Sequence, residues 1–125
     1  MSTIPEDLYY TKTHEWVRKE KEGYRMGITD HAQSELTDVV YVEFEKTGKA
    51  VKTGDVVASV ESVKTVSEIY APVDGTIISV NEAVAKKPER INQDPYGDGW
   101  FVILKPSSGG ESLLSAQEYR KAIGE

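Results

Sequence analysis

The segment ESVKTVSE, residues 61–68, contains the residue best suited to carry chemistry, a single lysine at position 64. The segments on both sides, GDVVASV and IYAPVDGTIISV, are rich in β-branched residues and favour strands. Lys64 interrupts this pattern with a charged amine. A lysine that enzymes can reach is a site for acylation, which removes the positive charge and adds a flexible arm.

The position of Lys64 depends on whether the chain reverses there. A reversal at Lys64 would pair Ser62 with Thr65. Glu61 would then pair with Val66, one step further from the tip. The turn contains no Gly, Asn or Asp, so hairpin rules favour it only weakly. From the residues alone, a lysine displayed at a hairpin tip and an ordinary exposed strand lysine both remain open.

The motifs of common enzyme and metal sites are missing from the sequence. It contains no G-x-S-x-G, no G-x-x-x-x-G-K-[ST] and no G-x-G-x-x-G. It has no cysteine, and its two histidines, His14 and His31, have no zinc-motif spacing. From spacing alone, no two carboxylates can be placed together, so the sequence does not support a catalytic pair. We therefore expect no catalytic residues and no metal site.

The composition suits one globular domain, residues 1–125, with 38% apolar and 29% charged residues. A formal net charge of −6 argues against nucleic acid or an anionic membrane as a partner. No apolar run approaches the roughly 18 residues that cross a bilayer. The N-terminus, MSTIPEDLYY, carries no targeting pattern. We therefore expect a cytoplasmic protein.

The expected elements are short strands with a few helices. Strands are predicted in THEWVRKE, YRMGI, VVYVEF, VVASVES, VKTVSEIYA, TIISV and WFVILKP. Turns are predicted at Gly23, Gly48, Gly54, Pro72 and Asp74–Gly75. Helices are predicted after Thr29 or Asp30, from Asn81 to before Pro88, and after Ser115, where Glu118 completes a capping box. STIPEDLYY, KTGKAVKTGD and NQDPYGDGW are expected to be irregular. The pattern predicts an antiparallel all-β core with a C-terminal helix.

Seven segments, spread over residues 9–119, resemble the H proteins of the glycine cleavage system, which are lipoyl carriers. They are YTKTHEWVR, GITDHAQSEL, DVVYVE, ASVESVK, SEIYAPVDG, DPYGDGW and SLLSAQEY. ESVK followed by SE is similar to the lipoylation motif of that family. The resemblance implies a lipoyl/biotinyl-type barrel-sandwich hybrid of two small antiparallel sheets, with short helices and a C-terminal helix.

The resemblance also implies a cofactor and partners. Lys64 would carry lipoic acid in amide linkage, added by a lipoate-attaching enzyme. The arm would take the aminomethyl group of glycine from the pyridoxal-phosphate glycine decarboxylase to the folate-dependent aminomethyltransferase. Dihydrolipoyl dehydrogenase would reoxidise it. The carrier itself would catalyse no step, and we expect it to be a monomer.

A carrier of a labile amine benefits from a groove with apolar walls and a few carboxylates. Carried over from the family, the groove residues would be Thr13, Glu15, His31 and Glu68. Glu15 is the expected partner of the amine. Phe44 and Glu45 stand where a leucine–proline pair is usual in the family, a departure far from the lysine in sequence.

Three other functions remain to be weighed. A lipoyl donor in a lipoate-relay pathway would share the fold and the lysine. A biotin carrier usually has methionines beside its lysine, whereas Val63 and Thr65 stand here. An unmodified β-rich interaction module would explain the absence of enzyme motifs. The intact mass of the protein after exposure to the ligases distinguishes the last two from a lipoyl carrier.

Overall fold

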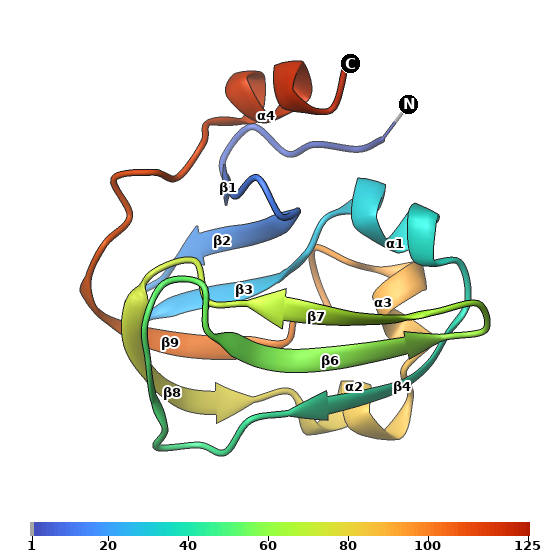
Figure 1. Ribbon diagram of the computed structural model, residues 1–125, viewed down its shortest axis with the longest axis horizontal. Helices are drawn as coiled ribbons and strands as arrows, with labels where there is room; N and C mark the ends of the chain where they lie inside the picture. The colour runs from blue at the N-terminus through green and yellow to red at the C-terminus, as the bar shows by residue number, and fades with distance from the viewer. Residues whose placement is uncertain (1) are drawn as a thin grey trace.

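The computed structural model describes residues 2–125 as two antiparallel sheets with helices around them (Figure 1). The larger sheet has the strand order β1-β2-β3-β9-β8-β5, and the smaller has the order β4-β6-β7. The strands of the larger sheet are β1 (Tyr9–Tyr10), β2 (Glu15–Lys19), β3 (Tyr24–Ile28), β5 (Ala50–Val51), β8 (Asp74–Val80) and β9 (Val102–Ser108). Those of the smaller are β4 (Val39–Phe44), β6 (Val56–Ser62) and β7 (Val66–Tyr70). The predicted fold class is confirmed.

The main core lies between the inward faces of the two sheets. The strands of the small sheet bury Val42, Val60 and Ile69 on their inward face, and these pack in one cluster with Met26 and Ile77 of the large sheet. Burying each such aliphatic side chain stabilises the fold by about 1.5–3 kcal/mol. The sheets are therefore held face to face by apolar contact. Their inward faces are filled by this core, so a binding site must lie at the edges of the sheets or on their outer surfaces.

A second, smaller core joins the two ends of the chain. Its buried members are Ile4, Leu8, Tyr10, Trp16, Ala116 and Tyr119. Two of them belong to the C-terminal helix α4 (Ala116–Ala122), which sits beside the N-terminal segment in Figure 1. The rings of Tyr10 and Tyr119 stack with centroids 4.8 Å apart. This cluster ties α4 to β1 and β2.

Helices α1 (Asp30–Leu36), α2 (Glu82–Lys86) and α4 begin where the sequence predicts. Helix α1 is capped by Thr29, whose Oγ1 accepts the Ala32 N–H at 3.2 Å. The capping box of Ser115 and Glu118 at α4 is confirmed. Helix α2 ends before Pro88, as expected from the restriction that proline places on the residue before it. Caps of this kind supply partners for backbone N–H groups that no helix can satisfy internally.

Four local predictions were wrong. Tyr9–Tyr10 forms β1 by pairing with β2, and Tyr10 also exchanges backbone hydrogen bonds with Leu114, far along the chain. Ala50–Val51 pairs with β8 as β5, and Arg90–Gln93 forms the short helix α3. Asp74–Gly75 is not a turn but the start of β8. The Asp74 carboxylate accepts hydrogen bonds from Thr53 and Ser108, so it serves as a strand-edge anchor.

The side chain of Asn92 on α3 holds the loop between α1 and β4. Its Oδ1 accepts the Val39 N–H at 2.9 Å, and its Nδ2 donates to the Thr37 carbonyl at 2.6 Å. Thr37 has a φ of 64°, unusual for a residue with a Cβ. The next residue, Asp38, accepts the N–H of Val63 at 3.0 Å. Asn92 therefore supports the loop on which the β6–β7 hairpin tip rests.

We expect Asn92→Ala to lower the free energy of unfolding by about 1–3 kcal/mol, because it leaves the buried Val39 N–H without a partner. Urea unfolding measures the change. The control is Gln93→Ala, which alters an exposed side chain on the same helix and should change stability by less than about 0.5 kcal/mol. Equal losses in the two variants would contradict this role for Asn92.

Candidate attachment lysine and adjoining clefts

The β6–β7 hairpin reverses at Lys64. Glu61 pairs with Val66, and the Ser62 N–H donates to the Thr65 carbonyl at 2.8 Å. Both pairings match those expected from a reversal at this lysine. Lys64 is exposed at the tip, which lies on the same side of the molecule as α1 in Figure 1. Of the two positions that the residues alone left open, the structure has the hairpin tip.

Ser62 explains how a turn without Gly, Asn or Asp is stabilised. Its side chain is buried, with 5% exposure, and its Oγ accepts the N–H groups of Lys64 and Thr65 at 3.3 and 3.1 Å. The same hydroxyl donates to the Thr65 carbonyl at 3.2 Å. A serine hydroxyl that binds nearby backbone groups replaces the turn residues that hairpins usually need. The backbone below Lys64 is thus anchored while the lysine side chain extends into solvent.

One cleft, which we call the hairpin cleft, lies between the hairpin and α1. Its volume is about 250 Å³. Its lining combines apolar side chains with two carboxylates and several hydroxyls. It comprises Thr13, His14, Ile28, Ala32, Glu35, Leu36, Thr65, Ser67, Glu68 and Ile69. Because Thr65 follows Lys64 directly, the cleft begins next to the candidate attachment lysine.

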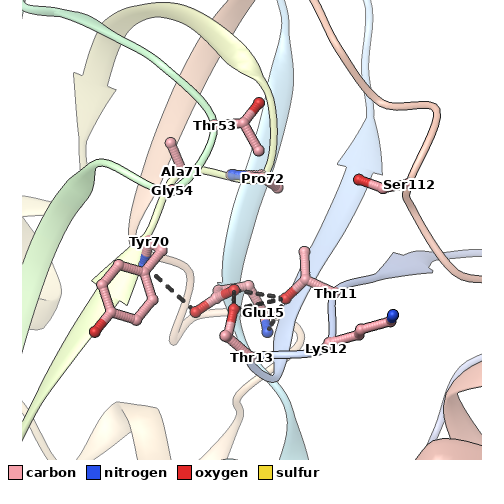
Figure 2. A pocket seen from close by; sticks show the side chains of 10 residues that line it. All are labelled: Thr11, Lys12, Thr13, Glu15, Thr53, Gly54, Tyr70, Ala71, Pro72 and Ser112. Atoms are coloured by element: carbon pink, nitrogen blue, oxygen red, sulfur yellow. Dashed lines mark hydrogen bonds between the residues drawn. The ribbon is translucent and has the colours of Figure 1, made fainter.

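A second cleft, which we call the Glu15 cleft, has a volume of about 390 Å³. Figure 2 shows its lining, with the Glu15 side chain between the hydroxyls of Thr11 and Thr13 on one side and the Tyr70 backbone nitrogen on the other. Ala71 and Pro72 form an apolar part of the wall. Thr13 lines both clefts, so the two adjoin at this residue.

Glu15 is a buried carboxylate with only 1% exposure. Its Oε1 accepts hydrogen bonds from both Thr11 and Thr13, the former at 2.5 Å. Within residues 2–125, its Oε2 accepts only the Tyr70 N–H, at a long 3.4 Å. Burial raises the pKa of Glu15 above its ordinary value, and these hydrogen bonds oppose the rise. Oε2 is therefore the atom with capacity left for a cationic group.

The structure places the four predicted groove residues differently. Thr13 lines both clefts, Glu15 lines the cleft named after it, and the exposed Glu68 lines the hairpin cleft. His31 lines neither. Its imidazole Nε2 lies 2.9 Å from a Glu35 carboxylate oxygen, and Glu35 does line the hairpin cleft. His31 therefore contacts the cleft residue Glu35 without lining the cleft itself.

Sequence reasoning missed Glu35, His14 and Ser67 as cleft residues. Glu35 lies one helical turn after His31, a spacing that places both on the same helix face and was the available signal. The pKa of His14 is lowered overall, mainly by burial and also by the neighbouring His31, and the Glu35 carboxylate partly opposes this shift. Ser67 lies on the same face of the hairpin as Thr65, because alternate residues of an extended chain point to the same side, and both line the hairpin cleft. No cluster of His, Cys, Asp or Glu able to hold a metal ion occurs within residues 2–125.

The raised pKa of Glu15 predicts how its replacement changes the pH dependence of stability. The folded state holds this proton more tightly than the unfolded chain, so stability falls as pH rises from the ordinary value of 4.5 through the raised pKa. Glu15→Gln lacks this loss. The stability of the variant relative to the unaltered protein should therefore increase over that window. Urea unfolding at a series of pH values measures it, and parallel curves would contradict the assignment.

Comparison with known proteins places this geometry in a family. Residues 8–125 match the family model described as glycine cleavage H-protein. A relative from Thermoplasma acidophilum, described as a probable glycine cleavage system H protein, is 54% identical over 123 residues, covering 98% of each chain. The glycine cleavage system H protein of Thermus thermophilus is 53% identical over 122 residues, covering 96% of this chain and 95% of the relative.

A solved structure gives the same result. The crystal structure of a glycine cleavage system H protein from Mycobacterium marinum superposes with a TM-score of 0.91 at 40% identity, covering 98% of this chain and all of that one. Within residues 2–125, no helix is long and apolar enough to cross a membrane. The chain belongs to the glycine cleavage H-protein family, the non-catalytic carrier proteins of the glycine cleavage system.

Proposed function

We propose that the protein is a cytoplasmic lipoyl carrier of glycine cleavage and that Lys64 is the residue to which lipoic acid is attached. The observation that carries the proposal is the exposed Lys64 side chain on an anchored hairpin tip, next to a cleft with apolar walls. Attachment joins Lys64 Nζ to an activated lipoyl carboxyl group as an amide. The amine loses its proton, and the activating group leaves.

The hairpin cleft and the Glu15 cleft suit the lipoyl arm that Lys64 would carry. Lipoate supplies a dithiolane that accepts the aminomethyl group of glycine. Ile28, Leu36 and Ile69 provide apolar walls in the hairpin cleft, and these exclude water from an aliphatic chain. Thr13 connects this cleft to Glu15. Under this proposal the under-used Oε2 of Glu15 pairs with the cargo's ammonium group as a charge-assisted hydrogen bond.

The partners follow from the same proposal. The decarboxylase and the aminomethyltransferase exchange the aminomethyl group with the arm, and the dehydrogenase restores its disulfide. A lipoate-attaching enzyme must first reach Lys64. The apolar side chains of Val63 and Val66, 66% and 63% exposed, flank the lysine and provide contact area for these enzymes. The carrier acts as a single domain over residues 1–125.

Lys64→Arg keeps the charge but should abolish lipoylation, because the guanidinium group stays protonated and is not an amine nucleophile. Intact mass spectrometry after incubation with a lipoate ligase should show one adduct on the unaltered protein and none on the variant. With the three partner enzymes, glycine-dependent NADH formation should fall to background. Lys86→Arg, which changes an exposed lysine on α2, is the matched control and should behave as the unaltered protein does. Full modification of Lys64→Arg, or a biotin-sized adduct, would contradict the proposal.

Glu15→Gln should shorten the lifetime of the loaded arm because it removes the negative charge that pairs with the cargo. We expect release of ammonia from the loaded, isolated carrier to accelerate about tenfold, the effect of losing one charged hydrogen bond worth roughly 1.5 kcal/mol. The rate of lipoylation of Lys64 should be unchanged. Unaltered release in Glu15→Gln would remove Glu15 from the groove while leaving the attachment site intact.

A further inference from the structure

The turn from Thr11 to Glu15 carries both Thr13 and Glu15, and the residue between them is conformationally strained. His14 has a φ of 71°, in the left-handed region that residues with a Cβ rarely adopt. Such a conformation persists only where the surrounding structure holds it. The contacts that hold His14 therefore also determine the direction in which Thr13 and Glu15 point.

The backbone of His14 is held at both of its polar groups. Its N–H donates to the Thr11 carbonyl at 3.2 Å, and its carbonyl accepts the N–H of Thr29 at 3.0 Å. Thr29 is the cap of α1 and is fully buried. The turn is thus joined to the start of α1 by a backbone hydrogen bond that spans two separate elements.

The side chain of His14 is held by the C-terminal helix. Its Nδ1 lies 2.8 Å from the hydroxyl of Tyr119, and the same hydroxyl lies 2.7 Å from Thr29 Oγ1. Tyr119 is fully buried, and its ring is fixed by stacking on Tyr10. One hydroxyl of α4 therefore contacts both the strained residue and the cap of α1.

Thr29, Tyr119 and His14 form one continuous chain of hydrogen bonds. Thr29 Oγ1 accepts a hydrogen bond from the Ala32 N–H and donates one to the Tyr119 hydroxyl. The Tyr119 hydroxyl then donates a hydrogen bond to His14 Nδ1. In the reverse order, Thr29 Oγ1 would accept two hydrogen bonds and its own buried proton would have no acceptor among the described residues, so the first order satisfies these groups better. Deleting the Tyr119 hydroxyl breaks this chain at its centre, and both Thr29 and His14 lose a partner in a buried region.

We propose that Tyr119, acting through His14, is a positioning residue for Glu15. It makes no contact with the cargo. It holds the turn in the conformation that keeps the Thr11 and Thr13 hydroxyls on Oε1 and leaves Oε2 open to the cleft. The inference rests on the proposed role of Glu15 as the partner of the cargo amine. It gives the C-terminal helix an indirect role in shaping the Glu15 cleft, although no residue of α4 lines either cleft.

The test compares Tyr119→Phe with Tyr10→Phe in the loaded, lipoylated protein. Both variants remove one buried hydroxyl from the same stacked pair, and the Tyr10 hydroxyl donates to the Pro5 carbonyl, away from the turn. Tyr119→Phe should accelerate release of ammonia from the loaded carrier about fivefold, the equivalent of one net hydrogen bond. Tyr10→Phe should leave release unchanged. Equal acceleration in both variants would overturn the inference.

Two further readouts separate positioning from general loss of structure. Lipoylation of Lys64 should proceed at the original rate in Tyr119→Phe, because the hairpin tip does not contact this residue. His14→Ala should accelerate release, and His14→Asn should restore it. Asparagine tolerates the left-handed conformation, and its amide lies where Nδ1 does. Failure of His14→Asn to restore slow release, while His14→Ala accelerates it, would overturn the role of the His14–Tyr119 contact.

The carboxyl carbon of Glu15, observed by NMR in the unlipoylated protein, tests the positioning without any cargo. Tyr119→Phe should raise the pKa of Glu15, because it weakens the threonine hydrogen bonds that lower it. The Glu15→Gln variant then separates the two proposals. Faster release in Glu15→Gln with unchanged release and an unchanged Glu15 titration in Tyr119→Phe overturns the inference alone. Unchanged release in Glu15→Gln overturns the proposed role of Glu15, whatever Tyr119→Phe shows.

Discussion

The buried carboxylate of Glu15 is the constraint around which this end of the molecule is organised. A carboxylate removed from water is unfavourable unless its oxygens receive hydrogen bonds. Here the hydroxyls of Thr11 and Thr13 supply them to Oε1. They can do so only because the chain turns sharply at His14, and the left-handed backbone at that residue must in turn be held. The buried carboxylate, the strained turn and the contacts with α1 and α4 are thus parts of one connected arrangement.

Lys64 is organised by the opposite principle. Its backbone is anchored by Ser62 and, through Val63, by the loop that Asn92 supports, whereas its side chain is exposed. A rigid base limits the conformational entropy that an enzyme must remove on binding the tip. A free side chain lets an attached arm reach several active sites and return to the clefts. Under the proposed function, the protein would hold a mobile arm at a fixed point, next to a buried carboxylate that would pair with its cargo.

The elements around these two sites differ in how far they could be predicted. The register of the β6–β7 hairpin follows from a reversal at Lys64, because adjacent strands pair locally, but the residues alone left open whether the chain reverses there. The caps at Thr29 and Ser115 were also readable, since capping involves residues three positions apart. By contrast, β1 pairs with β2 and is bridged to Leu114, and the Asp74–Gly75 pair lies in a strand that pairs with β9, where the Asp74 carboxylate binds Thr53 and Ser108. Turn propensity was overridden there by contacts that local sequence does not encode.

The sequence by itself determined the family, the strand-rich fold and the candidate lysine, because these depend on short motifs and on periodicity within single elements. Only the tertiary structure decided that Glu15 is buried, that Glu35 rather than His31 lines the hairpin cleft, and that Tyr119 contacts His14. The physical reason is distance along the chain. Tyr119 and His14 are 105 positions apart, and only the packing of α4 on the N-terminal strands brings them within hydrogen-bonding range.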